Sequence, residues 1–191
     1  EIFMIVLSEK NLANLHSRLF SLQKPQRVTE VTDEDLENAI TIDGAKYSRD
    51  KKRLLKGDKF SDFSILPGTE VICDSAFSWC KNLQQITIPN SVTHIGTNPF
   101  VECYHIRLKC HSNHFIIDGK ALFNKERNRI ISCMSNDSTF TIPNSVTHIG
   151  DYAFESCENL QQITIPNSVT HIGDYAFNGC KKLQQITIPN S

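Results

Sequence analysis

The same pattern of apolar and polar residues recurs along most of the chain as a near-identical sequence motif, which is called the repeated word below. Residues 153–175 read AFESCENLQQITIPNSVTHIGDY, and residues 176–191 begin the same word again after a period of 23. Residues 76–98 carry a further copy. A fixed period of about 20 to 50 residues is typical of a repeat array, in which each unit buries its apolar face only against its neighbours. The repeat therefore predicts a solenoid.

The pattern inside one repeat predicts a short β-strand followed by a corner. Apolar and polar residues alternate over residues 162–165, and Pro166 lacks the N–H that would continue the strand. The apolar spacing over residues 153–157 is typical of a short 3₁₀ or helical turn. We predict an α/β repeat solenoid over residues 39–191, with one parallel strand per repeat in a single sheet whose strands lie about 4.8 Å apart.

Two irregular segments interrupt the array. The spacing from Phe100 to Phe154 is 54 residues, which exceeds two periods of 23 by eight. Asp43-Gly44 and Asp118-Gly119 each lie between apolar stretches, and each is followed by a charged turn. Because glycine tolerates positive φ, Asp-Gly between apolar stretches is a strong signal for a tight hairpin. The sequence therefore predicts two inserted β-hairpins.

Residues 1–38 do not carry the repeat. Leu12, Leu15 and Leu19 have helical spacing before Pro25, and residues 32–35 (Thr-Asp-Glu-Asp) predict the start of a second helical turn. We expect a helical N-terminal cap that covers the first apolar rung of the solenoid. The alternative is a linker from another domain. Because the chain opens with Glu1 and stops within a repeat, we expect a fragment of a longer protein.

Composition and charge argue against two classes of protein, namely nucleic-acid-binding proteins and membrane-spanning proteins. The 20 Lys and Arg residues against 21 Asp and Glu residues give a net charge of −1, which argues against a nucleic-acid-binding protein. The longest apolar run, residues 2–7, is too short to span a bilayer and has no basic leader or cleavage site of a signal peptide. We expect no membrane insertion in this fragment.

The repeated word resembles the BspA-type leucine-rich repeat, also called the Treponema pallidum type. The resemblance rests on A-F-x-x-C-x-x-L-x-x-I-x-I-P-x-S-V-x-x-I-G and covers about residues 39–191. It implies a leucine-rich-repeat array of a surface-displayed or secreted protein that acts in adhesion and protein binding. The implied partner is a protein ligand on a host or neighbouring cell. The family has no shared catalytic residues, so the resemblance implies neither an enzyme nor a cofactor.

The polar face of the predicted strands is the first candidate site. An extended face of hydrogen-bonding side chains is what repeat proteins offer to partners, although the alternative is that Gln and Thr only keep the sheet soluble. In the irregular repeat, Arg107 and Lys109 add charge to this face. The candidate residues are Gln85, Thr87, Arg107, Lys109, Thr139, Thr141, Gln162, Thr164, Gln185 and Thr187.

The charged hairpin tips are the second candidate site. They would hold an acidic partner or a polyanion. The alternative is that these charged turns are only solvated, as is common, because Asp50 and Glu126 lie between the basic residues. The tip residues are Arg49, Lys51, Lys52, Arg53, Lys125, Arg127 and Arg129.

Cysteine and histidine recur at fixed repeat positions. The chain has seven cysteines without a C-x-x-C pair, so we expect buried free thiols rather than a zinc site. His94, His148 and His171 share the position before Ile-Gly, where we expect a solvent-facing ladder on adjacent rungs and no metal. No motif of a nucleophile, phosphate loop or metalloprotease is present.

Three function classes stay open from the sequence. The first is a non-enzymatic interaction and adhesion module, the second a structural spacer or scaffold array inside the cell, and the third the regulatory arm of a larger enzyme. The last rung ends before its Val-x-x-Ile-Gly return, so it leaves Leu183, Ile186 and Ile188 half covered. We therefore also expect end-to-end self-association of this fragment.

Overall fold

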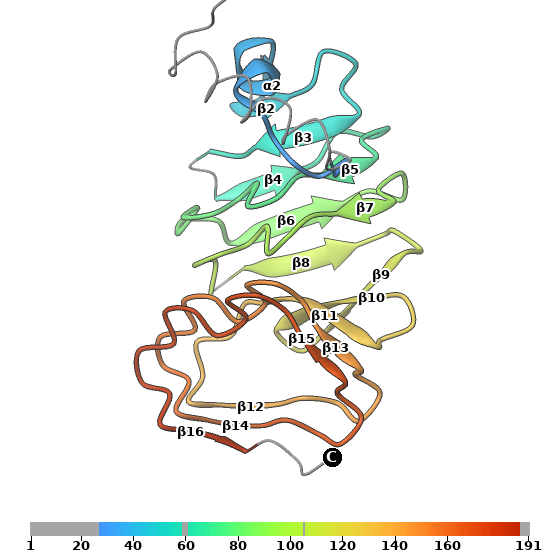
Figure 1. Cartoon of the computed structure of the whole chain (residues 1–191). Helices are drawn as coiled ribbons and strands as arrows, with labels where there is room; N and C mark the ends of the chain where they lie inside the picture. The colour runs from blue at the N-terminus through green and yellow to red at the C-terminus, as the bar shows by residue number, and fades with distance from the viewer. Residues whose placement is uncertain (1–26, 59–60, 105, 188–191) are drawn as a thin grey trace, which may run out of the picture.

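The chain winds into a solenoid of stacked coils. A computed structural model describes residues 27–58, 61–104 and 106–187, and the helix expected before Pro25 lies outside them (Figure 1). Each regular repeat contributes two strands, as in β6 (Gln85–Ile88) with β7 (His94–Ile95) and β14 (Gln162–Thr164) with β15 (His171–Ile172). The prediction of one strand per repeat was therefore wrong. Pro89 and Pro166 follow the longer strands, and the chain then turns a corner into a second, shorter ladder.

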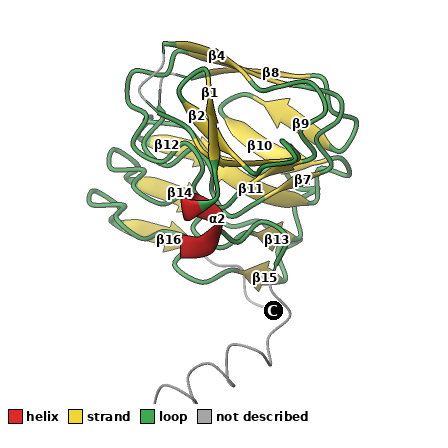
Figure 2. Ribbon diagram, turned by 90° about the horizontal axis from the view of Figure 1, so that it is seen from above, coloured by secondary structure: helices red, strands yellow, loops and turns green. Residues whose placement is uncertain are grey.

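The longer strands form two separate parallel sheets rather than one. The first sheet has the order β4-β6-β8 and the second the order β12-β14-β16, and β8 does not pair with β12. The two sheets lie apart in both views (Figures 1 and 2). Their other strands are β4 (Asp62–Ser64), β8 (Arg107–Cys110), β12 (Thr139–Thr141) and β16 (Gln185–Thr187). The outward faces of these two sheets are called the strand face below.

The remaining strands form two mixed sheets that include the Asp-Gly segments. One has the order β1-β2-β3-β5-β7 and the other β15-β13-β11-β10-β9. The antiparallel pair β1–β2 turns at Asp43-Gly44, as predicted, whereas β9–β10 turns at Gly119-Lys120, because Asp118 is the last residue of β9 and pairs with Ala121. The remaining bounds are β1 (Ile40–Ile42), β2 (Ala45–Tyr47), β3 (Arg53–Lys56), β5 (Val71–Ile72), β9 (Phe115–Asp118), β10 (Ala121–Asn124), β11 (Arg129–Cys133) and β13 (His148–Ile149).

A third side of each coil is a wall of tight turns over residues 75–80, 98–103, 152–157 and 175–180. Within one rung the N–H of Cys80 donates to the carbonyl of Phe77 (3.1 Å). Between rungs the N–H of Phe77 donates to the carbonyl of Pro99 (2.7 Å), and the N–H of Phe154 donates to that of Ala176 (2.8 Å). The expected turns are therefore joined into a hydrogen-bonded wall, which satisfies backbone groups that burial would otherwise penalise.

Strands β9, β10 and β11 form a layer between two apolar cores. Leu122 of β10 is fully buried in the first core, which includes Phe77 and Phe100, whereas Phe123 belongs to the second core with Phe154. Because successive side chains of a strand point to opposite faces, this layer is apolar on both sides. The inserted segment thus separates the two halves of the array and supplies each with part of its core.

Asn98 joins the two halves at this layer. Its side chain is 1% exposed, and its Nδ2 donates to the carbonyl of Tyr152 (2.6 Å). The hydroxyl of Ser132 on β11 donates to Asn98 Oδ1. The equivalent positions of the other repeats are Ser75, Tyr152 and Tyr175. Asn98 is buried at this position and satisfies polar groups from two other segments.

The described N-terminal region contains one short helix, α2 (Asp33–Glu37), which confirms the second helical turn expected there. Thr32 and Asp35 form a reciprocal capping box, with Asp35 N–H donating to Thr32 Oγ1 (3.1 Å) and Thr32 N–H to Asp35 Oδ2 (3.0 Å). Leu36 packs against a small cluster that includes Leu55 and Cys73. No other helix occurs in residues 27–58, 61–104 and 106–187, and α2 is too short to cross a membrane.

Candidate partner-binding surface

The strand face carries exposed side chains in register. Gln85 lies between Asp62 of β4 and Arg107 of β8, and Thr87 lies between Ser64 and Lys109. In the second sheet, the rows are Thr139, Gln162 and Gln185, and Thr141, Thr164 and Thr187. Gln85 and Thr87 are half-buried, and the other eight predicted residues are exposed. The sequence predicted the outward direction of these side chains correctly, but the structure distributes them over two sheets.

Two shallow grooves run along the strand face. One has a volume of about 690 Å³, and its lining consists of the polar residues Thr139, Thr141, Asn144, Gln162, Thr164, Asn167 and Ser168 and the apolar residues Phe140, Ile142, Ile163, Ile165 and Pro166. Its lining contains no ionisable side chain. Hydroxyl and amide groups both donate and accept hydrogen bonds, so this groove suits a neutral, hydrogen-bonding surface such as a polypeptide.

The other groove, of about 610 Å³, lies at the start of strands β6 and β8. Gln85 and Arg107 line it with Asp62 and Lys81. Thr87, Lys109, Gln185 and Thr187 line neither groove. The sequence reasoning missed Asp62 and Ser64, because Asp62-Phe63-Ser64 departs from the Gln-Ile-Thr word. Their polar-apolar-polar alternation was the signal that would have placed them on this face.

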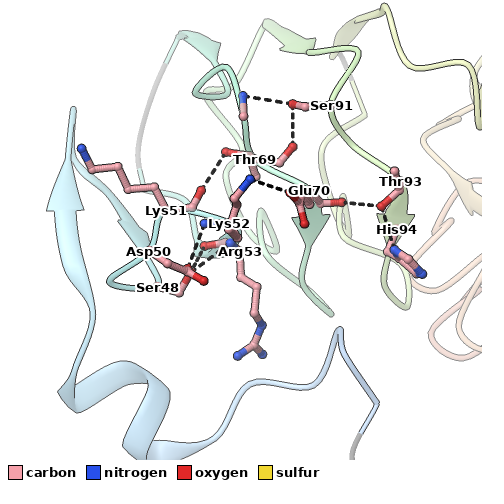
Figure 3. A network of polar contacts seen from close by, with 11 residues as sticks. Ser48, Asp50, Lys51, Lys52, Arg53, Thr69, Glu70, Ser91, Thr93 and His94 are labelled. Atoms are coloured by element: carbon pink, nitrogen blue, oxygen red, sulfur yellow. Dashed lines mark hydrogen bonds and ion pairs between the residues drawn. The ribbon is translucent and has the colours of Figure 1, made fainter.

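The basic hairpin tips are largely tied into the protein's own structure. Arg53 Nη1 lies 2.7 Å from Asp35 Oδ1. Figure 3 shows the ion pair between Lys52 Nζ and Glu70 Oε1, which lie 2.5 Å apart. The hydrogen bond and charge of Glu70 raise the pKa of Lys52. Arg49 donates to Asn38 Oδ1 (2.9 Å), and Arg127 pairs with Asp118. Lys51, Lys125 and Arg129 form no ion pair within the described ranges, so the tips are not one continuous basic surface.

Figure 3 also shows how hydroxyl groups of the repeated word join successive rungs. Ser91 Oγ donates to the carbonyl of Thr69 (2.7 Å), and Thr93 Oγ1 donates to the carbonyl of Glu70 (3.4 Å). Ser145 Oγ donates in the same way to the carbonyl of Arg127 (2.9 Å). These three hydroxyl groups thus stabilise the corner of the coil, whereas the hydroxyl of Ser168, at the same repeat position as Ser91 and Ser145, is buried without a hydrogen-bond partner among the described residues.

The histidines form the expected ladder. His148 pairs in register with His171, the two ring centroids lie 5.6 Å apart, and both side chains are exposed, as is His94. Among the described residues, no group of three or more His, Cys, Asp or Glu side chains is arranged to hold a metal ion.

All seven cysteines are free thiols, and five are buried. Burial raises the pKa of Cys73 to about 11 and that of Cys103 to about 12. Cys110 and Cys180 are half-buried. The thiols thus pack mainly as small apolar groups in the core, as predicted.

We expect the native thiols to react slowly with Ellman's reagent at pH 8. A thiol reacts as thiolate, which forms only above its pKa, so a rise of about two units lowers the reactive fraction of Cys73 by about 100-fold. Unfolding in denaturant without reductant should expose all seven thiols. Immediate reaction of Cys73 and Cys103 in the native protein, or fewer than seven thiols after unfolding, would contradict this arrangement.

Parallel ladders, a wall of turns and a 23-residue repeat define a repeat protein of the leucine-rich solenoid class. The family described as BspA type leucine rich repeat region matches residues 51–139 and 132–191, with six copies, and the chain belongs to this family. Arrays of this kind are generally protein-interaction modules and generally not enzymes.

Solved structures of bacterial leucine-rich-repeat proteins are similar to this chain. A leucine rich cell surface protein from Faecalibacterium prausnitzii is 29% identical, with a TM-score of 0.52 over 67% of this chain and 41% of that one. The pneumococcal vaccine antigen PcpA is 22% identical, with a TM-score of 0.57 over 72% of this chain and 42% of that one. A protein from Eubacterium ventriosum is 24% identical, with a TM-score of 0.54 over 66% and 41%.

The chain therefore spans about two fifths of the length of each of these proteins. Among curated proteins none matches this chain.

Proposed function

We propose that this chain is a non-enzymatic protein-binding array of a surface-displayed or secreted protein, and that it contacts its partner through the strand face. The observation that carries the proposal is the in-register rows of exposed hydroxyl, amide and charged side chains on β4, β6, β8, β12, β14 and β16. Membership of the repeat family and the likeness to a leucine rich cell surface protein support surface display and adhesion.

Within the strand face, β8 is the proposed centre of the contact. Arg107 and Lys109 are exposed and add cationic groups where the regular strands have Gln and Thr. Asp62 at the other edge of the same sheet adds a carboxylate. Arginine is enriched among residues that dominate binding energy, and charge fixes the register of a partner.

The proposal also assigns a role to the N-terminal region. The packing of Leu36 and Val31 against Leu55, Val71 and Cys73 supports the proposal that α2 and its flanks cap the first rung. Self-association through the last rung stays a prediction, supported by the exposure of Ile172 and Ile186, each at 40%.

The strand-face proposal predicts that Arg107→Glu with Lys109→Glu weakens partner binding by tenfold or more, a loss of about 1.4 kcal/mol. Stability should change by about 0.5 kcal/mol or less, because both side chains are exposed. The wild-type array first captures proteins from extracts of cell-surface and secreted proteins. A captured protein is then purified, and its Kd is measured by calorimetry.

The matched control reverses two exposed hairpin-tip lysines, Lys51→Glu with Lys125→Glu. Its Kd should stay within about twofold of wild type, since nonspecific charge effects alone are small for exposed groups. If the tip variant loses binding and the strand-face variant keeps it, the hairpins are the site and the proposal is wrong.

A further inference from the structure

A cleft lies where the first mixed sheet ends and the inserted layer begins. It has a volume of about 350 Å³ and is lined by β7 on one side and by residues of β9, β10 and β11 on the other. In Figure 1, β7 and β9 lie on the same side of the array. This cleft is separate from both grooves of the strand face, because none of their lining residues line it.

The charged lining of the cleft is entirely basic. Arg27, His94 and Arg129 line it, and no Asp or Glu does. The carboxylate of Asp74 lies beside the cleft, where Oδ2 is 3.2 Å from Arg27 Nη2 and Oδ1 accepts a hydrogen bond from the N–H of Thr97 (2.8 Å). Arg129 is exposed and forms no ion pair within residues 27–58, 61–104 and 106–187. The cleft therefore holds one positive charge that the described part of the chain does not neutralise.

The floor of the cleft is apolar. Ile95, Phe115 and Ile131 line it, and each is only half-buried. β7 is the last strand of its sheet, and the N–H groups of His94 and Gly96 donate toward β5. Since peptide groups alternate in direction along a strand, those of Ile95 face away from β5 at this free edge. The cleft thus combines the backbone N–H of Ile95, the guanidinium of Arg129 and an apolar floor.

We propose that this cleft binds a carboxylate carried on a short apolar or aromatic group. The planar guanidinium of Arg129 matches a carboxylate with two parallel hydrogen bonds, and such charge-assisted bonds are about twice as strong as neutral ones. The apolar part of the ligand covers Ile95, Phe115 and Ile131. A cleft of this volume lies within the range typical of small-ligand sites. The site is independent of the proposed strand-face function.

The experiment titrates the whole chain with N-acetyl-phenylalanine, which combines one carboxylate with one aromatic ring. Binding is followed by chemical-shift changes in the protein's NMR spectrum, and the expected Kd is on the order of 1 mM for a ligand of this size. N-acetyl-phenylalanine amide, which lacks the charge, should bind at least tenfold more weakly. The shifts should fall on residues of β7, β9 and β11.

Arg129→Gln tests the role of the guanidinium, and Lys46→Gln is the control, because Lys46 is an exposed cation on β2 that lines neither the cleft nor the two grooves. The first should weaken binding at least tenfold, and the second should leave Kd within twofold. Because Arg129 is exposed, Arg129→Gln should retain the wild-type melting temperature within about 2 °C; if it does not, Arg129→Lys takes its place and should also weaken binding, because lysine cannot form the two parallel hydrogen bonds of the guanidinium.

Three results would overturn the proposal: no shifts up to 20-fold above the expected Kd, equal binding of the acid and the amide, or equal binding by the variant and wild type. Inorganic phosphate that binds as tightly as N-acetyl-phenylalanine would also overturn it, because the apolar floor would then contribute nothing.

Discussion

Phe154→Ala should lower the free energy of unfolding by about 3–5 kcal/mol, the usual loss for a buried phenylalanine. Phe154 is fully buried in the second core. Its ring centroid lies 5.1 Å from that of Phe177 in a stacked arrangement and 5.2 Å from that of Phe140 in an edge arrangement. Truncation removes both aromatic contacts and leaves a cavity that neighbouring rungs cannot fill without breaking the ladders on either side. Urea unfolding followed by circular dichroism measures the loss.

Phe177→Ala is the matched control, because Phe177 holds the same position one repeat later and is only half-buried. Its loss should be clearly smaller than that of Phe154→Ala, since less apolar area leaves water at that position. Equal losses, or a change below about 0.5 kcal/mol for Phe154→Ala, would show that Phe154 does not occupy the centre of the second core.

Asn98→Ala should lower the free energy of unfolding by about 2–4 kcal/mol, because it leaves buried polar groups without partners. The carbonyl of Tyr152 loses the Asn98 Nδ2 donor at 2.6 Å, and the hydroxyl of Ser132 loses its acceptor. Ser132 is fully buried, so water cannot replace the lost bond without opening the junction. Thermal unfolding measured by calorimetry should show a lower melting temperature.

A double-mutant cycle separates this contact from general damage. Ser132→Ala should cost much less in the Asn98→Ala background than in wild type, with a coupling energy of about 1–2 kcal/mol. Additive losses would mean that Asn98 and Ser132 do not interact and that the two halves of the array are joined elsewhere.

The repeat architecture was accessible from the sequence because it rests on local signals. Near-identical words at a fixed period predict stacking, and Pro89 and Pro166 after alternating strands predict where each longer strand ends. The second strand was not predicted. His94-Ile95 is only two residues long and becomes a strand because Val71-Ile72 on the preceding rung supplies its hydrogen bonds. Such pairing depends on a neighbour one period away and leaves no pattern within the segment itself.

The sequence indicated that the array is interrupted, but it did not predict that the interruption separates the array into two halves. The extra eight residues between Phe100 and Phe154 showed an interruption. The apolar character of both faces of β10, with Leu122 in one core and Phe123 in the other, shows why that interruption becomes a dividing layer. Asn98 joins the two halves at this junction, and its partners are 34 and 54 residues away in the chain.

The candidate surface was also predictable only in part. Alternation along each strand predicted that Gln162 and Thr164 face outward, because side-chain direction in a strand is a local property. The ion pairs of the hairpin tips were beyond prediction, since Arg53 pairs with Asp35, which lies 18 positions earlier in the chain. The cleft between β7 and β11 also depends on how the two halves meet, which no single repeat encodes.

Hydrogen exchange of the array bound to its captured partner tests the strand-face proposal most directly. Protection on binding should appear in peptides that cover residues 85–88, 107–110, 139–141 and 162–164, with the largest change at 107–110. Peptides that cover the hairpin tips at residues 48–53 and 124–129 should exchange as they do in the free protein. Protection confined to those tips, with unchanged exchange at residues 107–110, would contradict binding through the strand face.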